Sequence, residues 1–314
     1  MNEPIIEVQD LVKRYGKLAA VDGVSFDVPA STTFGLLGPN GAGKTTIVKM
    51  LTGLAKPTSG RVRMFGHNMA TRPNAIKRRF GHVYAAMAFF PALNALENLT
   101  FFGRFYDLSA RQLRERIEET LRFVELWEER KKAVGAYSSG MKQRLGIAKA
   151  LVHEPDLLLF DEATNGVDVE GTNDIRELMF DLRVQGKTAV VTSHRLDEIE
   201  LLSDDIAILD EGKIVRRGSP QSIREGLRGL LFKYIVERVE PIQETWSHPA
   251  ATVRYIGTAN VVLSEEDVRG SLVEAFGADA VSEVEPTFEE ACLWILQHPE
   301  ANASLVGAET ASSG

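Results

Sequence analysis

The sequence has only one cysteine, Cys292, and no long uninterrupted apolar segment in its 314 residues. A single cysteine cannot form an internal disulfide, so nothing points to an oxidising compartment. The most apolar run, 83–96, contains Pro91 and Asn94 and is shorter than the ~20 residues of a membrane-spanning helix. The first four residues lack the basic and apolar regions of a signal peptide. We therefore expect a cytoplasmic protein whose membrane contacts, if it has any, depend on another chain.

An excess of positive charge is also lacking, since 36 Lys and Arg face 44 Asp and Glu for a net charge of −8. This balance argues against a protein that coats nucleic acid, so no nucleic acid partner is expected. Residues 237–300 hold 13 acidic and only 3 basic side chains. The shift predicts a large domain at 1–228, a small acidic domain at 229–300 and a flexible tail, rich in Ala, Ser and Gly, at 301–314.

Apolar β-like runs alternate with amphipathic segments through most of the chain, which predicts a largely parallel sheet covered by helices on both faces. The expected strands are 5–8, 23–28, 32–37, 157–160, 188–192 and a pair at 206–209 and 213–216, and the expected helices are 44–54, 108–127, a segment ending at 152, and 169–184. Short strands at 232–236, 252–255 and 260–263, a helix at 266–276, and a last strand and helix ending near 297 predict a small α+β unit.

A glycine-rich motif lies between a predicted strand and a predicted helix, and reads Gly38-Pro39-Asn40-Gly41-Ala42-Gly43-Lys44-Thr45. It fits the phosphate-binding pattern G-x-x-x-x-G-K-[ST] in the required context. The glycines let backbone N–H groups turn toward phosphate oxygens, Lys44 reaches the β- and γ-phosphates, and the Thr45 hydroxyl can ligate Mg²⁺.

Two adjacent carboxylates, Asp161 and Glu162, follow the apolar run 157–160. Ligands collect at the carboxyl edge of such sheets, so we assign Asp161 to Mg²⁺. Strand alternation turns the next side chain elsewhere, which leaves Glu162 free to accept a proton from the attacking water. An Asp-Glu pair alone would more often be a helix cap, but the phosphate loop in the same chain favours the catalytic interpretation.

Residues 4–226 resemble the ATP-binding cassette ATPases, and the diagnostic segment is Tyr137-Ser138-Ser139-Gly140-Met141-Lys142-Gln143-Arg144. The resemblance implies a P-loop NTPase (RecA-like) α/β core with an antiparallel β subdomain and an α-helical subdomain near 86–155, here followed by the small α+β domain. It also implies ATP and Mg²⁺ as ligands, with the loop residues from Gly38 to Thr46 around the phosphates. In the family, Ser138 and Gly140 would contact ATP held by the other subunit of a head-to-tail dimer.

Three further residues match the family one by one. Tyr15 matches the aromatic residue that stacks on adenine, Asp168 the loop aspartate that joins the two ATP sites, and His194 the histidine that contacts the γ-phosphate. With Glu162 and Lys44, His194 completes the predicted catalytic set. Without the resemblance, each of these residues would have an ordinary structural explanation.

The sequence departs from the family where a glutamine normally follows the strand resembled by 80–84, because no glutamine occurs between Gln9 and Gln112. The replacement run, 85–90, is apolar, and an apolar side chain cannot ligate Mg²⁺. Met87, Phe89 and Phe90 either form part of a groove for a helix of a membrane partner or pack beneath the helical subdomain. Thr164 also stands where the family commonly has proline.

The resemblance implies a nucleotide-binding subunit of a transporter, peripheral on the inner face of the membrane through separately encoded permease subunits. A single cassette with a small acidic C-terminal domain resembles the bacterial branch that exports drugs, lipids and polysaccharides. The alternatives are a soluble ATPase of the same family acting on a non-membrane partner, or a nucleotide-gated switch. The sequence does not identify the cargo.

Overall fold

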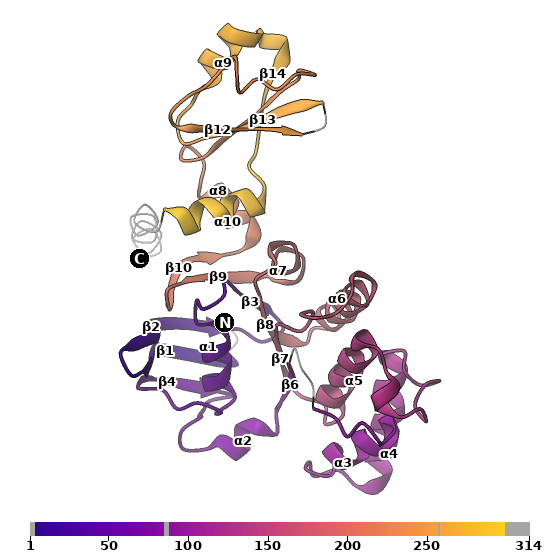
Figure 1. The fold of residues 1–314 in the computed structure, drawn as a ribbon. Coiled ribbons are helices and arrows are strands. Elements are labelled where there is room, and N and C mark those ends of the chain that lie inside the picture. The colour runs from indigo at the N-terminus through magenta and orange to yellow at the C-terminus, as the bar shows by residue number, and fades with distance from the viewer. Residues whose placement is uncertain (1–3, 85–87, 257, 299–314) are drawn as a thin grey trace. The chain divides into compact units, whose positions relative to one another are not determined.

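The computed structural model describes residues 4–84, 88–256 and 258–298. The described residues form two compact units, one within 1–217 and one within 218–314 (Figure 1). Across the described ranges, no helix is both long and apolar enough to cross a bilayer.

The centre of the first unit is a six-stranded sheet in the order β10-β9-β3-β8-β7-β6. Its strands are β3 (Thr33–Leu37), β6 (Phe80–Tyr84), β7 (Leu157–Asp161), β8 (Thr188–Ser193), β9 (Asp205–Asp210) and β10 (Lys213–Gly218). The five strands from β9 to β6 are mutually parallel. Every residue of β3 and β8 is buried, as expected for strands covered on both faces. The predicted α/β fold class is confirmed.

A second, antiparallel sheet of the first unit has the order β2-β1-β4-β5, and Figure 1 labels β2, β1 and β4. It is built from β1 (Ile6–Tyr15), β2 (Leu18–Val28), β4 (Ser59–Met64) and β5 (His67–Asn68). Alternate apolar side chains of this sheet share one hydrophobic core with helix α1 and the central sheet. The shared core fixes the antiparallel sheet against the segment that follows β3.

The helices of the first unit are α1 (Lys44–Leu51), α2 (Pro73–Lys77), α3 (Ala95–Gly103), α4 (Ala110–Phe123), α5 (Ser139–Leu151), α6 (Val169–Val184) and α7 (Leu196–Leu202), with a 3₁₀ turn at Val134–Ala136. Ser109 caps α4, which buries Leu113, Ile117 and Leu121 along one face, as the helical spacing predicted. The sequence did not predict α3, which starts at a capping box made by Asn94 and Glu97.

The second unit contains α8 (Pro220–Glu225), β11 (Phe232–Val236), β12 (Ala251–Ile256), β13 (Ala259–Ser264), α9 (Arg269–Phe276), a 3₁₀ turn (Ala278–Ala280), β14 (Val281–Val284) and α10 (Phe288–Gln297). Its antiparallel sheet has the order β12-β13-β11-β14. The unit starts about ten residues before position 229, because α8 packs against α10.

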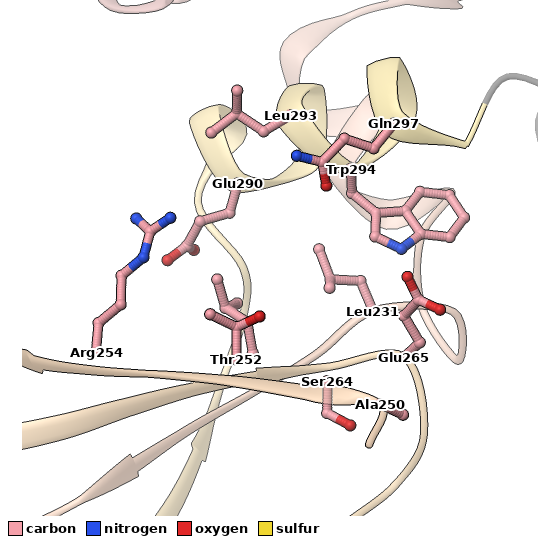
Figure 2. Close-up of a pocket in the computed structure, with 11 residues that line it drawn as sticks. Leu231, Ala250, Thr252, Arg254, Ser264, Glu265, Glu290, Leu293, Trp294 and Gln297 are labelled. Atoms are coloured by element: carbon pink, nitrogen blue, oxygen red, sulfur yellow. The ribbon is translucent and has the colours of Figure 1, made fainter. Parts of the chain in front are cut away.

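A cavity of about 180 Å³ lies in the second unit, between α10 and the sheet (Figure 2). Both of its carboxylates are paired: Glu290 with Lys233 at 2.9 Å, and Glu265 with His298 at 2.7 Å. No glycine-rich loop is among the described residues that line it, and the phosphate-binding motif lies in the first unit.

Candidate active site

Three neighbouring parallel strands bring the predicted residues to one edge of the central sheet. Leu37 at the end of β3 is opposite Ser193 of β8, and Asp161 at the end of β7 is opposite Thr192. The glycine loop, the carboxylate pair and His194 follow directly after these strand ends. They therefore meet at the carboxyl edge of the sheet, where ligands of such folds bind.

The glycine loop has a shape that requires glycine at two positions. Gly43 has φ +106°, and a Cβ there would lie 2.4 Å from the Ala20 carbonyl oxygen. A Cβ at Gly38 would lie 2.3 Å from the Leu209 carbonyl oxygen. These contacts are with backbone atoms, so a side chain at either position would force the loop away from its neighbours. Gly43 is followed at once by α1, whose first N–H groups face the loop.

Lys44 is buried although it carries a charge. Its Nζ donates to the carbonyl oxygens of Gly38 at 2.7 Å and Pro39 at 3.1 Å, and lies 3.5 Å from Glu162 Oε1. The Lys44 ammonium group thus lies within the loop and is held by the carbonyl groups at the start of the loop. A cation held there can attract phosphate groups bound in the loop.

The Thr45 hydroxyl and the Asp161 carboxylate face each other at 3.3 Å. Both supply oxygen ligands of the kind Mg²⁺ prefers, so the residues fit this ion. In the described residues no cluster of three or more His, Cys, Asp or Glu side chains could hold a metal. Such a site would hold Mg²⁺ through few protein ligands and share it with bound phosphates, which is the usual arrangement for this ion.

Glu162 lies beyond the end of β7 and has the left-handed φ of +52°. Its direction therefore comes from this turn and not from strand alternation, which corrects the sequence argument. Glu162 Oε2 lies 2.7 Å from His194 Nδ1, and the same carboxylate faces Lys44. A left-handed conformation at a glutamate is uncommon and costs about 1 kcal/mol or more, and such strain is concentrated at functional sites.

The site contains a polar residue that the sequence analysis did not single out, Thr192. Its hydroxyl donates to Asp161 Oδ1 at 2.7 Å and accepts from the Glu162 N–H at 3.1 Å. A threonine at the carboxyl end of an otherwise apolar strand was the available signal.

Tyr84, at the end of β6, is opposite Asp161 in the sheet register. Burial, and then the Asp161 charge, raise the pKa of Tyr84, so its phenol is neutral at physiological pH. The Tyr84 carbonyl accepts from the amide of the buried Gln143 at 2.8 Å, which links β6 to α5. Neither residue was predicted as a site residue, although Gln143 belongs to the diagnostic segment 137–144.

Ser138, Gly140 and Asp168 form a second group, at the N-termini of α5 and α6. Ser138 accepts from the Met141 N–H at 3.2 Å, and Asp168 accepts from the Gly171 N–H at 2.8 Å, so both are helix caps. A Cβ at Gly140 would lie 3.3 Å from Gly171 Cα, which means that glycine here permits close packing of α5 on α6. No hydrogen bond within the described ranges joins this group to the glycine loop.

The remaining predicted residues lie around the loop or at the end of β1. Asn40, Gly41 and Thr45 are exposed, Thr46 is half-buried and Ala42 is buried. Tyr15 is the last residue of β1; its ring is half exposed and lies 4.9 Å from Lys13 Nζ. No hydrogen bond between described residues ties Tyr15 to the carboxyl edge.

The predicted groove residues divide between described and undescribed positions. The run 85–87, including Met87, lies outside the described residues. Phe89 is half-buried and meets the Phe102 ring of α3 edge to face, and Phe90 is exposed and stacks on the same ring. Exposed rings of Phe101 and Phe105 continue this aromatic surface, and beside it lies a cavity of about 370 Å³.

Lys149 of α5 lines this cavity. Its Nζ lies 4.6 Å from the centre of the Phe102 ring, and burial lowers the pKa of Lys149. Over the described ranges, Lys149 has no ion pair with a carboxylate. The surface thus combines exposed aromatic rings with an unneutralised cation.

Comparison with protein families finds a match between residues 21–165 and the ABC transporter family. The bacitracin transport ATP-binding protein BcrA of Bacillus licheniformis is 43% identical over 212 residues, or 67% of this chain and 68% of that protein. The linearmycin resistance ATP-binding protein LnrL of Bacillus subtilis is 37% identical over 72% of each chain. The daunorubicin/doxorubicin resistance ATP-binding protein DrrA of Streptomyces peucetius is 37% identical over 71% of this chain and 67% of that protein.

Solved structures with the same fold include CbiO1 from Clostridium perfringens, part of an ABC transporter complex, with a TM-score of 0.64 and 25% identity over 72% of this chain and 95% of that chain. The dimeric structure of the bacterial ABC transporter cassette MJ0796 has a TM-score of 0.62 and 28% identity, over 68% of this chain and 98% of that chain. From its motifs, its fold and these similarities, the chain belongs to the ABC transporter family as a member carrying the ATP-binding cassette.

Proposed function

We propose that this protein is the ATP-binding and ATP-hydrolysing subunit of an exporter whose membrane-spanning subunits are separate chains. The observation that carries the proposal is the convergence of Lys44, Thr45, Asp161, Glu162 and His194 at one sheet edge. The similar proteins named for bacitracin transport and for drug resistance support export in particular.

ATP would lie with its phosphates in the loop from Gly38 to Thr46, where backbone N–H groups and Lys44 neutralise their charge. Tyr15 would stack on the adenine ring. Thr45 and Asp161 would hold Mg²⁺, which supplies charge neutralisation at the transferred phosphoryl group. Among the loop residues, Asn40, Gly41, Ala42 and Gly43 would contribute through their backbone.

Hydrolysis would use Glu162 as the base toward the attacking water. The His194 Nδ1 atom is hydrogen-bonded to the Glu162 carboxylate at 2.7 Å and would orient that carboxylate. The other ring nitrogen of His194 would reach the γ-phosphate. The Thr192 hydroxyl would orient the Asp161 carboxylate and hold the Glu162 backbone N–H, which fixes the start of the Glu162 side chain. The contact of Glu162 with Lys44 would give way when phosphate takes its place beside the ammonium group.

A second copy of the cassette would complete the site. Ser138 and Gly140 at the start of α5, and Asp168 at the start of α6, form a separate group in one chain. Their helix N-termini are suited to an anion held by another subunit. The dimeric cassette of similar fold supports a head-to-tail pair. ATP would close this pair, and hydrolysis would reopen it.

The membrane partner would dock on the aromatic surface made by Phe89, Phe90, Phe101 and Phe105. Exposed apolar clusters are typical of interaction sites, and the cavity beside this one suits an amphipathic helix. This docking would place the protein on the inner face of the membrane. The cassette domain would correspond to the first unit, up to residue 217, and the acidic second unit, which the sequence predicts at 229–300, would be an accessory to it.

The test is a pull-down of tagged protein from gently solubilised membranes, with ATP hydrolysis measured beside a Glu162→Gln control. We expect recovery of a multi-span protein and a hydrolysis rate that falls ~100-fold or more in the control, in line with loss of a general base. Purely soluble partners with hydrolysis intact would favour the soluble ATPase, and absence of hydrolysis in the wild type would favour the nucleotide-gated switch. A Phe89→Asp variant that still recovers the same membrane protein would refute the docking surface.

A further inference from the structure

A buried carboxylate lies directly behind the candidate active site. Glu198 belongs to α7 and is 2% exposed. Its Oε2 accepts hydrogen bonds from the Ser193 hydroxyl at 2.6 Å and from the Thr164 hydroxyl at 3.3 Å. Both hydroxyl residues are buried as well. A carboxylate removed from water is costly unless it is hydrogen-bonded, and these two hydrogen bonds offset that cost.

The first contact leads to His194. The Ser193 hydroxyl donates to Glu198 and also accepts from the Arg195 N–H at 3.0 Å. This hydroxyl therefore fixes the residues on both sides of His194. A change at Glu198 would release Ser193 and loosen the turn that aims the imidazole.

The second contact leads to Glu162 and Asp168. Thr164 lies two residues after Glu162, and its carbonyl accepts from the Val167 N–H at 3.3 Å, just before Asp168. The same turn is closed by a hydrogen bond from the Asn165 N–H to the Glu162 carbonyl at 3.0 Å. One carboxylate oxygen thus joins the turn that follows β7 to the turn that follows β8.

Charge pairing does not explain the arrangement. The neighbouring Asp197 pairs with Arg176 at 2.7 Å and with Arg195 at 3.6 Å. In the part of the chain that the structure describes, Glu198 has no such cation and is held by hydroxyl groups. The Ser193 hydrogen bond, at 2.6 Å, is short and fixes distance more narrowly than an exposed ion pair does, while the Thr164 contact, at 3.3 Å, is longer and weaker.

We propose that Glu198 is a positioning residue for hydrolysis, which holds the turns bearing Glu162 and His194 at the spacing of their 2.7 Å contact. It acts from behind the site, through Thr164 and Ser193, and does not touch the nucleotide. The inference rests on the proposed function, in which Glu162 is the base. Because Thr164 supplies one of the two bonds, the departure noted in the sequence at this position gains a physical role.

The test uses the purified full-length chain and compares Glu198→Gln, Thr164→Val and Thr164→Ser with the wild type. Valine removes the hydroxyl at nearly constant volume, while serine retains it. Thr120→Val is the matched control, since Thr120 is equally buried and its hydroxyl donates only within α4. The measurements are kcat and KM for ATP from pH 6 to pH 9, together with thermal unfolding midpoints.

A small displacement of reacting groups can lower a rate by up to ~100-fold, so we expect kcat to fall about 10-fold in Glu198→Gln and about 3-fold in Thr164→Val. KM should stay within about 2-fold, because the glycine loop is untouched. Thr164→Ser should restore kcat to near the wild-type value, and Thr120→Val should leave it unchanged.

Equal kcat in Thr164→Val, Thr164→Ser and Thr120→Val would overturn the proposal, even if Glu198→Gln failed to fold. A parallel rise in KM would also overturn it, since that result indicates damage to nucleotide binding. Failure of the proposed function is a different outcome: the wild type itself would show no hydrolysis that depends on Glu162.

Discussion

The two units of this protein use their polar residues in opposite ways. In the first unit, parallel strands end at one edge, and Asp161, Thr192 and the glycine loop collect there. In the second unit every strand pair is antiparallel, so successive strands end at opposite edges. Asn260 is fully buried in this unit. Its side-chain oxygen accepts from the Ile242 N–H, and its side-chain amide donates to two backbone carbonyls.

Strand direction therefore decides where polar side chains that remain available to a ligand can lie close together. A parallel sheet brings several strand ends, and the loops after them, to one place, where they face outward together. An antiparallel sheet disperses its ends, and polar groups are satisfied inside the fold. Substitutions at the carboxyl edge of the first unit's parallel sheet should therefore change chemistry, and those in the second unit should change stability alone.

The largest effect is expected at Lys44. Lys44→Ala removes the cation enclosed by the glycine loop and should lower the rate of ATP hydrolysis by ~1000-fold, comparable to the loss of a key electrostatic contact. Lys233→Ala is the control in the second unit, where the lysine pairs with Glu290 at 2.9 Å. We expect it to leave hydrolysis unchanged. Similar rates of ATP hydrolysis in Lys44→Ala and Lys233→Ala would contradict the claim that only the first unit carries the chemistry.

Acid should destabilise the first unit at a higher pH than the second. Burial first, and then Lys149, lower the pKa of His82 from 6.5 to about 4. Burial likewise lowers the pKa of His153 to about 4. Above pH 6.5 both rings are neutral whether the chain is folded or unfolded. Between pH 6.5 and about 4 only the unfolded chain takes up protons, so stability falls as the pH falls.

In the second unit burial acts to raise the pKa of Glu290, but hydrogen bonds from the Thr287 backbone and from Lys233 together outweigh it, so this pKa is lowered from 4.5. Its contribution is complete above pH 4.5 and is lost as the pH falls through the lowered value. Urea unfolding of the full chain at pH 7 and pH 5, followed by fluorescence, separates the units. Trp127 reports the first unit, and Trp246 and Trp294 report the second. His82→Gln should reduce the loss between the two pH values; an undiminished loss would contradict the assignment.

Thr192→Val should have a smaller effect on chemistry. It removes the hydroxyl that bonds Asp161 and the Glu162 N–H, and we expect about 10-fold slower hydrolysis, of the size seen when a supporting hydrogen bond is lost. Thr33→Val is the control on the same sheet: Thr33 is buried in β3, and its hydroxyl has no hydrogen-bond partner in the described structure. The measurement is the steady-state rate of ATP hydrolysis in the two variants. Equal rates would show that the Thr192 hydroxyl does not contribute to hydrolysis.

The smallest effect is expected at Tyr234, whose hydroxyl donates to Asp267 at 2.7 Å in the second unit. Tyr234→Phe should lower the free energy of unfolding by about 1 kcal/mol, because the acceptor is charged but largely exposed to water. Hydrolysis should be unaffected. Urea titration and a rate measurement on the same sample test both parts, and a reduced rate would mean that the second unit acts on the chemistry of the first.

Much of the fold and of the candidate site could be predicted from motifs and residue spacing along the sequence. The motif Gly38–Thr45 requires a strand before it and a helix after it, and both are present. The helix α4 followed from the spacing of Leu113, Ile117 and Leu121. Residues whose role depends on distant partners were not accessible. Thr192 has the pattern of an ordinary strand residue, and Glu198 lies in a segment for which no element was predicted; their roles follow only once β7 and β8 are side by side.

The sequence by itself determined the family, the glycine loop and the carboxylate pair, because these depend on residues close together in the chain. Tertiary structure alone decided that Glu162 contacts Lys44 and His194, which lie far from it in the chain. It also decided that Gly140 serves the packing of α5 on α6. The physical reason is that backbone conformation within a motif is encoded locally, whereas a hydrogen bond between two strand ends depends on the register of the whole sheet.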